Sequence, residues 1–138
     1  MIGVVVISHG PMAHATVESA KFFMGEIEQI ISLELKMEDN PEDFGERIKE
    51  ACASVDTGDG VIVLADLFGG TPCNQATYLL SENTHVVAGL SLAMLLELLS
   101  SRLCGTVNIE QIVETAKTGV VYINKFYQET QSDDDYDE

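Results

Sequence analysis

Tryptophan is absent from this chain of 138 residues, and proline, cysteine and histidine occur only three times each. Basic residues are also scarce: seven Lys and Arg stand against 23 Asp and Glu, for a formal net charge of −16. So acidic a surface repels both nucleic acids and anionic membranes. The most apolar stretch, 90–99, is interrupted by Ser91 and Glu97 and is too short for a bilayer. We therefore expect no nucleic-acid partner and no insertion into a membrane.

The three cysteines, Cys52, Cys73 and Cys104, are odd in number and show no C-x-x-C spacing. The first apolar run, 2–7, lacks the basic leader and the length of a signal peptide. Both features favour a soluble protein of the reducing cytoplasm. The dispersed histidines and cysteines show no metal-ligand spacing either, so neither a metal nor another cofactor is expected.

Strand and helix patterns alternate along the chain. Continuous β-branched apolar runs predict strands buried on both faces. Helical patterns with start and stop signals lie between them. This alternation predicts one α/β domain over 1–128, with a mostly parallel, doubly wound sheet and helices on both faces. The predicted strands are 2–8, 28–35, 60–65, 84–88 and a last one over 120–126, and the predicted helices are 11–24, 41–55, 71–81, 91–103 and 109–118.

The segment 129–138 differs from the rest of the chain. It holds six of the 23 acids and no base, which leaves the body with 17 acids against seven bases and a net charge of −10. A segment that is mostly charged has little to bury, so a frayed, disordered tail is expected.

Two loops are the expected location of the chemistry. In doubly wound sheets, ligands lie beyond the carboxyl ends of the strands, where the strand order reverses. For a flavodoxin-like strand order this point lies between the first and third strands. The loops in question follow Ser8 and Ala65, and they read S-H-G-P at 8–11 and D-L-F-G-G-T-P-C-N at 66–74.

His9 and Asp66 should face each other across these loops. A carboxylate that accepts a hydrogen bond from one imidazole nitrogen fixes the tautomer and leaves the other nitrogen as a nucleophile. Gly69 and Gly70 permit backbone conformations closed to other residues, and Thr71 can cap the following helix. The free N–H groups there favour an anion. A histidine, an orienting carboxylate and an anion site together predict a phosphohistidine that needs no metal.

The two loops resemble those of the enzyme IIA components of the mannose–fructose–sorbose family of the bacterial sugar phosphotransferase system (PTS). The resemblance rests on S-H-G at 8–10 and D-L-F-G-G-T-P-x-N at 66–74, and it extends over about residues 1–127. It implies that His9 accepts a phosphoryl group on Nε2 while Asp66 bonds Nδ1. The remaining residues it places around the phosphoryl group are Gly10, Gly69, Gly70 and Thr71.

The resemblance also implies the partners. The donor would be the histidine-containing phosphocarrier protein, HPr, and the acceptor a IIB component that serves the IIC/IID permease. Because this chain ends in an acidic tail where many relatives continue into a fused IIB domain, the IIB partner is expected to be a separate polypeptide. Apolar residues beside the site, Met12, Leu67 and Phe68, should form the docking face. Which sugar is transported cannot be read from a IIA sequence.

A homodimer is expected on two grounds. The helix over 91–103 is apolar on nearly every side, so it is either unusually deep or covered by a second subunit. The last strand, 120–126, would lie at a sheet edge that invites pairing with another chain. Members of the resembled family form dimers by exchanging this strand.

Other readings of the same residues remain. A receiver domain of two-component signalling would make Asp66 the phosphoryl acceptor, but it needs an acidic pair where this chain has Ser8-His9. A phosphoryl-donor subunit of a dihydroxyacetone kinase is closer, yet it lacks the 66–74 loop. A histidine phosphatase would need an arginine beside the histidine, and a flavin-binding module a hydroxyl-rich first loop. His14 and His85 are expected at the surface, and Cys73 as a packing residue.

Overall fold

The computed structural model describes residues 1–136, with side chains described through residue 131. Its centre is one four-stranded, all-parallel sheet in the order β2-β1-β3-β4. The strands are β1 (Gly3–His9), β2 (Ile30–Leu35), β3 (Val61–Ala65) and β4 (Thr84–Ala88). The predicted α/β class with a parallel sheet is confirmed, and so are these four strands to within two residues at either end.

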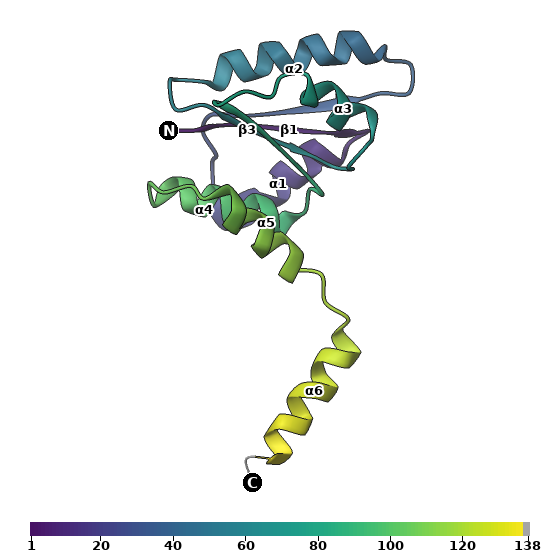
Figure 1. Cartoon of the computed structure of the whole chain (residues 1–138), viewed down its shortest axis with the longest axis vertical. Helices are drawn as coiled ribbons and strands as arrows, with labels where there is room; N and C mark the ends of the chain where they lie inside the picture. The colour runs from purple at the N-terminus through teal and green to yellow at the C-terminus, as the bar shows by residue number, and fades with distance from the viewer. Residues whose placement is uncertain (137–138) are drawn as a thin grey trace.

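Helices cover both faces of the sheet (Figure 1). On one face lie α2 (Pro41–Val55) and the short α3 (Thr71–Thr77). On the other lie α1 (Met12–Met24), α4 (Leu92–Leu103) and α5 (Ile109–Thr118). This two-sided cover explains why the strands read as continuous apolar runs, since each of their faces is buried.

Alternate residues of β1 enter two separate cores. Val4 and Val6 pack with α1, α4 and α5, whereas Val5 and Ile7 pack with α2 and α3. All four side chains are fully buried. The strand β1 lies between β2 and β3 and packs into both cores. The residue at its carboxyl end, His9, therefore follows a strand that is fixed by close packing on both faces.

The apolar helix α4 is deep within the chain's own fold. Four of its apolar side chains, Met94, Leu95, Leu98 and Leu99, are buried, and α1 and α5 both pack against the helix. Of the two explanations offered for its apolar character, burial within one subunit therefore accounts for most of it. Leu103, at its last turn, is exposed.

The strand predicted over 120–126 does not form within this chain. The chain leaves α5 as an extended segment and then forms α6 (Ile123–Tyr136), which projects away from the body (Figure 1). A strand needs a neighbouring strand to pair its N–H and C=O groups, whereas a helix pairs them internally. A segment that leaves the sheet therefore forms a helix, and β4 remains at the edge.

The acidic end also differs from expectation. A frayed tail was expected from residue 129, but the backbone is helical through Tyr136. Residues 137–138 lie outside the described part of the chain. Within residues 1–136, none of the helices combines the length and the apolar character that crossing a bilayer requires.

Candidate functional site

His9 and Asp66 meet at the carboxyl edge of the sheet, as predicted. The strands β1 and β3 pair in parallel with Ile7 opposite Ala65, so the residues that follow emerge side by side although 57 positions separate them. Asp66 Oδ2 lies 2.8 Å from His9 Nδ1 and also accepts the backbone N–H of His9 at 2.9 Å. One carboxylate oxygen thus holds both the ring and the backbone of the histidine.

This contact defines which imidazole nitrogen is free. An ionised carboxylate only accepts hydrogen bonds, so the shared hydrogen belongs to Nδ1 and the lone pair of the neutral ring lies on Nε2. The Asp66 side chain is 10% exposed and the His9 side chain 47% exposed. The anchoring group is therefore buried while the ring stays within reach of another protein.

The second carboxylate oxygen, Asp66 Oδ1, is buried and has no hydrogen-bond partner among the described residues. A buried acceptor without a donor carries a desolvation cost. Asp66 is thus positioned for its contact with His9 and not for its own solvation.

Gly70 lies against the imidazole ring. Its φ of −77° is open to any residue. A Cβ at this position would nevertheless lie 2.7 Å from His9 Cε1 and 3.4 Å from Nε2. Gly70 therefore makes room for the His9 ring because it has no side chain. The sequence had instead predicted that Gly70 is needed for its backbone freedom.

Backbone freedom is required one residue earlier and at the other loop. Gly69 has φ +84° and Gly10 has φ +58°, both in the left-handed region that favours glycine. The Gly70 N–H donates to the Leu67 carbonyl at 3.2 Å and so closes the loop as a turn. That N–H is already occupied, which leaves it less suited to an anion than its neighbours.

The predicted capping role of Thr71 is wrong. Helix α3 begins at Thr71 itself, with Gly70 at the cap position, and no side chain caps it. Thr71 instead lines a cavity together with His9 and Gly10. A threonine inside the first turn cannot fold back on the N–H groups that follow it as a residue in the cap position does.

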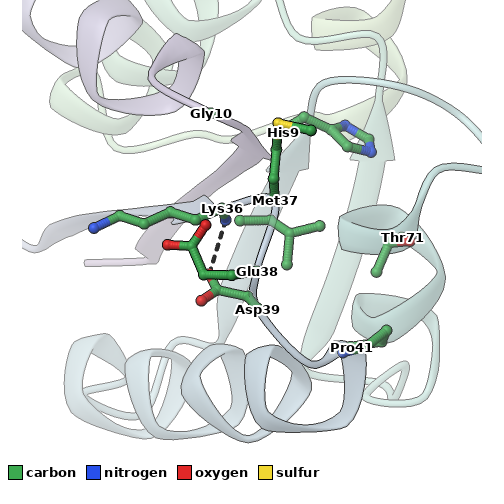
Figure 2. Close-up of a pocket in the computed structure, with 9 residues that line it drawn as sticks. His9, Gly10, Lys36, Met37, Glu38, Asp39, Pro41 and Thr71 are labelled. Atoms are coloured by element: carbon green, nitrogen blue, oxygen red, sulfur yellow. Dashed lines mark hydrogen bonds between the residues drawn. The ribbon is translucent and has the colours of Figure 1, made fainter.

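This cavity has a volume of about 490 Å³, and its far wall is the β2–α2 loop (Figure 2). Lys36 N–H donates to Asp39 Oδ2 at 2.8 Å, and Asp39 N–H donates back to the Lys36 carbonyl at 3.0 Å. Figure 2 shows Met37 rising from this closed turn toward the His9 ring, while the Lys36 ammonium group points away.

The predicted docking residues are exposed: Met12, Leu67 and Phe68 are 41%, 59% and 86% exposed. Met37 is fully exposed and lines the cavity beside His9. It was missed because it follows β2, which was not one of the two strands expected at the switch point; a methionine between charged residues at a strand end was the available signal.

The other chemically active residues lie elsewhere. The exposed His14 is 3.5 Å from Ser32 Oγ and 3.9 Å from Glu18, and His85 is half-buried on the edge strand β4. Cys73, on α3, is buried in the core that α2 and α3 form with the sheet, as expected of a packing residue. Within the described part of the chain, no three His, Cys, Asp or Glu side chains form a group that could hold a metal ion.

Comparison with known protein families identifies the family to which this fold and the His9–Asp66 site belong. Residues 3–117 match the family model described as the PTS system fructose IIA component. The chain belongs to this family. As a PTS IIA component of the mannose/fructose family it is a phosphotransferase-system protein, with a role in sugar transport.

Two individual proteins of the phosphotransferase system are similar to this chain in sequence. The chain is 32% identical over 104 residues to the PTS system fructose-specific EIIA component of Bacillus subtilis, covering 74% of this chain and 71% of that protein. It is also 32% identical over 103 residues to the PTS system mannose-specific EIIAB component of Escherichia coli, covering 73% of this chain. It spans only 32% of the length of that second relative.

Solved structures of PTS IIA proteins share the fold. The IIA protein associated with the fucose utilization operon of Streptococcus pneumoniae superposes with a TM-score of 0.84 at 31% identity, covering 91% of this chain and 95% of that one. The mannose/sorbose-specific IIA subunit of Enterococcus faecalis superposes with a TM-score of 0.75 at 27% identity, covering 87% and 92%.

Proposed function

We propose that this PTS IIA component is a phosphocarrier that receives a phosphoryl group on His9 Nε2 from HPr and passes it to a IIB component, in the cytoplasm. The observation that carries the proposal is the 2.8 Å contact between Asp66 Oδ2 and His9 Nδ1, which leaves Nε2 as the free nucleophile on a half-exposed ring. Family membership supports the same role.

The transfer is an exchange of one P–N bond for another. The lone pair of His9 Nε2 attacks the phosphorus of the phosphohistidine of HPr, and the P–N bond of the donor breaks as the new bond forms. The imidazole of HPr leaves with the electron pair. His9 keeps its proton on Nδ1 and gains positive charge in the ring, which Asp66 stabilises without itself being protonated. The second transfer, to IIB, reverses these steps.

The phosphoryl oxygens need hydrogen-bond donors. We assign this role to the backbone N–H of Gly69 and to the N–H and hydroxyl groups of Thr71, which lines the cavity beside His9. The Gly10 N–H already donates to the Leu35 carbonyl, so Gly10 contributes through the conformation of its turn. Fixed backbone dipoles stabilise the charge on the oxygens without requiring reorganisation during transfer. Gly70 contributes by leaving room for the ring.

The experiment that tests the proposal is phosphorylation by HPr in the presence of enzyme I and phosphoenolpyruvate, followed by intact mass. The wild type should gain one phosphoryl group and His9→Ala none, whereas His14→Ala and His85→Ala should be labelled like the wild type. The label should survive alkali and be lost in acid, as a phosphohistidine is.

Three results would overturn the proposal. Full labelling of His9→Ala would exclude His9 as the acceptor. A label destroyed by alkali would indicate an acyl phosphate on Asp66, the chemistry of the receiver-domain alternative. Retained docking of HPr with no transfer to any IIB protein would favour the donor subunit of a dihydroxyacetone kinase instead.

We also propose that the chain forms a homodimer through its C-terminal arm, 120–127. Six large apolar side chains lie exposed there, a patch that isolated monomers rarely carry. They are Val120, Val121, Tyr122, Ile123, Phe126 and Tyr127. Light scattering should give twice the chain mass, and truncation after Gly119 should give a monomer; a monomeric full-length chain would overturn the proposal.

A further inference from the structure

Ser8 is the one polar residue in the fully buried row of β1, and it directly precedes His9. Its side chain is 0% exposed, like those of Val4 to Ile7 before it. A hydroxyl is costly to bury unless it is hydrogen-bonded. Where its hydrogen bonds go therefore indicates what the residue contributes.

The hydroxyl bridges the turn that carries His9. Ser8 Oγ donates to the Gly10 carbonyl at 2.9 Å and accepts the Ala13 N–H at 2.7 Å. The second bond replaces a missing helix cap, because Pro11 occupies the cap position of α1 and provides no side-chain hydrogen bond. One buried atom thus ties the end of β1 to the start of α1 across His9.

The first bond orients the backbone beyond the histidine. Gly10 has φ +58° and its N–H donates to the Leu35 carbonyl at 2.8 Å. With its carbonyl held by a buried hydroxyl, the negative end of the Gly10 peptide faces the interior and not the exposed side, where His9 Nε2 lies. A carbonyl oxygen on that exposed side would repel an incoming phosphoryl group.

We infer that Ser8 is a positioning residue for phosphotransfer: its hydroxyl fixes the His9–Gly10 turn so that Asp66 can hold the ring with Nε2 aimed at the partner. This inference rests on the proposed function. A single Asp66 oxygen accepts hydrogen bonds from both the His9 backbone N–H and His9 Nδ1. Both bonds can form only while the backbone and the ring of His9 keep one relative orientation. Loosening the turn disturbs that double contact, and small misplacements of a reacting atom are expensive in rate.

The test compares Ser8→Ala with Ser91→Ala. Ser91 is a matched control, because its hydroxyl also caps a helix, accepting the Met94 N–H at 3.1 Å, but at α4 and without a contact to the His9 turn. Both variants lose a helix cap. At saturating HPr, the transfer rate per folded molecule should fall about 10- to 100-fold in Ser8→Ala and stay within about twofold of wild type in Ser91→Ala, with the KM for HPr unchanged in both.

A second readout is independent of transfer. In unphosphorylated wild type, ¹⁵N NMR of the His9 ring should show the hydrogen on Nδ1 in a slowly exchanging bond; in Ser8→Ala this signal should broaden or shift, and in Ser91→Ala it should not. Ser8→Thr, which keeps the hydroxyl, should restore rate and signal, and Ser8→Cys should be intermediate. If Ser8→Ala fails to fold, Ser8→Cys serves for both readouts.

A folded Ser8→Ala protein with a rate within twofold of wild type and an unchanged His9 ring spectrum would overturn the inference and leave Ser8 a mere helix cap. If instead wild type itself is not labelled at His9, the proposed function fails. The ring spectra would in that case still decide whether Ser8 orients His9.

Discussion

The two ends of the parallel sheet are built in opposite ways. At the amino end, Arg102 of α4 is buried and donates to the carbonyls of Ile2, Glu28 and Gln29. Gln29 in turn donates to the carbonyls of Met1 and Val55. At the carboxyl end, the Asp66 carboxylate holds the half-exposed His9 ring and does not bind backbone carbonyls. Each end has one buried polar atom without a partner among the described residues, Arg102 Nε at the amino end and Asp66 Oδ1 at the carboxyl end.

This difference suggests separate roles for the two ends of the sheet: the amino end stabilises the fold, and the carboxyl end holds the proposed reactive site. Side chains at the amino end satisfy backbone groups that would otherwise be unpaired, which stabilises the fold. Those at the carboxyl end hold the ring of His9, the proposed nucleophile, and exposed apolar side chains lie in the loops that follow the strands. Variants at the two ends should therefore fail in different assays.

The largest effect is expected at Asp66. Asp66→Asn keeps the shape but replaces the charged acceptor with a neutral amide, whose NH2 group can donate to Nδ1 and so favour the other tautomer of the ring. Transfer from HPr should therefore slow by about 10²–10⁴-fold. Rapid-quench kinetics measure the rate and urea unfolding the stability, which should change little. The control is Asp59→Asn at the amino end, whose exposed carboxylate pairs with the N-terminus at 2.9 Å. Equal rates in Asp66→Asn and wild type would remove Asp66 from the mechanism.

Arg102 should show the reverse behaviour. Arg102→Met deprives three carbonyls of their donor, and the free energy of unfolding should fall by about 2–4 kcal/mol. The transfer rate per folded molecule should stay within about twofold, and Arg102→Lys should recover part of the stability. Urea titration followed by kinetics in the folded range checks both. A large loss of rate in fully folded Arg102→Met would break the separation of the two ends.

Two adjacent glycines sharpen the comparison within the carboxyl end. Gly70→Ala places a Cβ against the His9 ring and should slow transfer about tenfold with little loss of stability. Gly69→Ala meets no atom within 4 Å but forces alanine to φ +84°, so it should cost roughly 1 kcal/mol of stability and little rate. The two variants are compared in the same kinetic and urea assays. The opposite ranking in either assay would contradict the packing described for Gly70.

The last contrast is a pH dependence from the amino end, confined to alkaline pH. Burial, with a contribution from Asp56, raises the pKa of the Cys52 thiol from 9.0 to about 11. The unfolded chain then loses this proton first, so the stabilisation is complete below pH 9 and declines as the pH rises toward 11. Urea unfolding should show a slope of at most about 1.4 kcal/mol per pH unit. Cys52→Ala should flatten it and Cys104→Ala, at an exposed thiol, should not.

Much of the site could be predicted because its two main residues, His9 and Asp66, lie at or directly after the ends of two strands that the sequence pattern identifies. The runs that became β1 and β3 have no polar alternation, which indicates parallel strands covered on both faces. Parallel strands end at one edge, so His9 and Asp66 had to emerge together if the strands are neighbours. The need for glycine at position 69 was likewise predictable from the loop sequence, because it depends only on the backbone φ of that residue.

The features of the site that could not be predicted depend on contacts between distant segments or on where a helix begins. The need for glycine at Gly70 comes from a ring 61 positions earlier in the chain, and the exposure of Met37 from a loop that only the fold brings to His9. Thr71 was assigned as a cap because threonine is a good capping residue, yet the helix begins one residue earlier than that role requires. Propensity alone cannot choose between neighbouring starting points.

The sequence by itself determined the layered α/β architecture, the two loops and the pairing of His9 with Asp66, because hydrophobic periodicity and turn chemistry act over a few residues. Tertiary structure decided that one Asp66 oxygen takes both N–H groups of His9, that Ser8 bonds across the turn, and that residues 123–136 form a helix instead of an edge strand. These outcomes depend on the distance and direction between groups that the folded chain, and not their order in it, brings together.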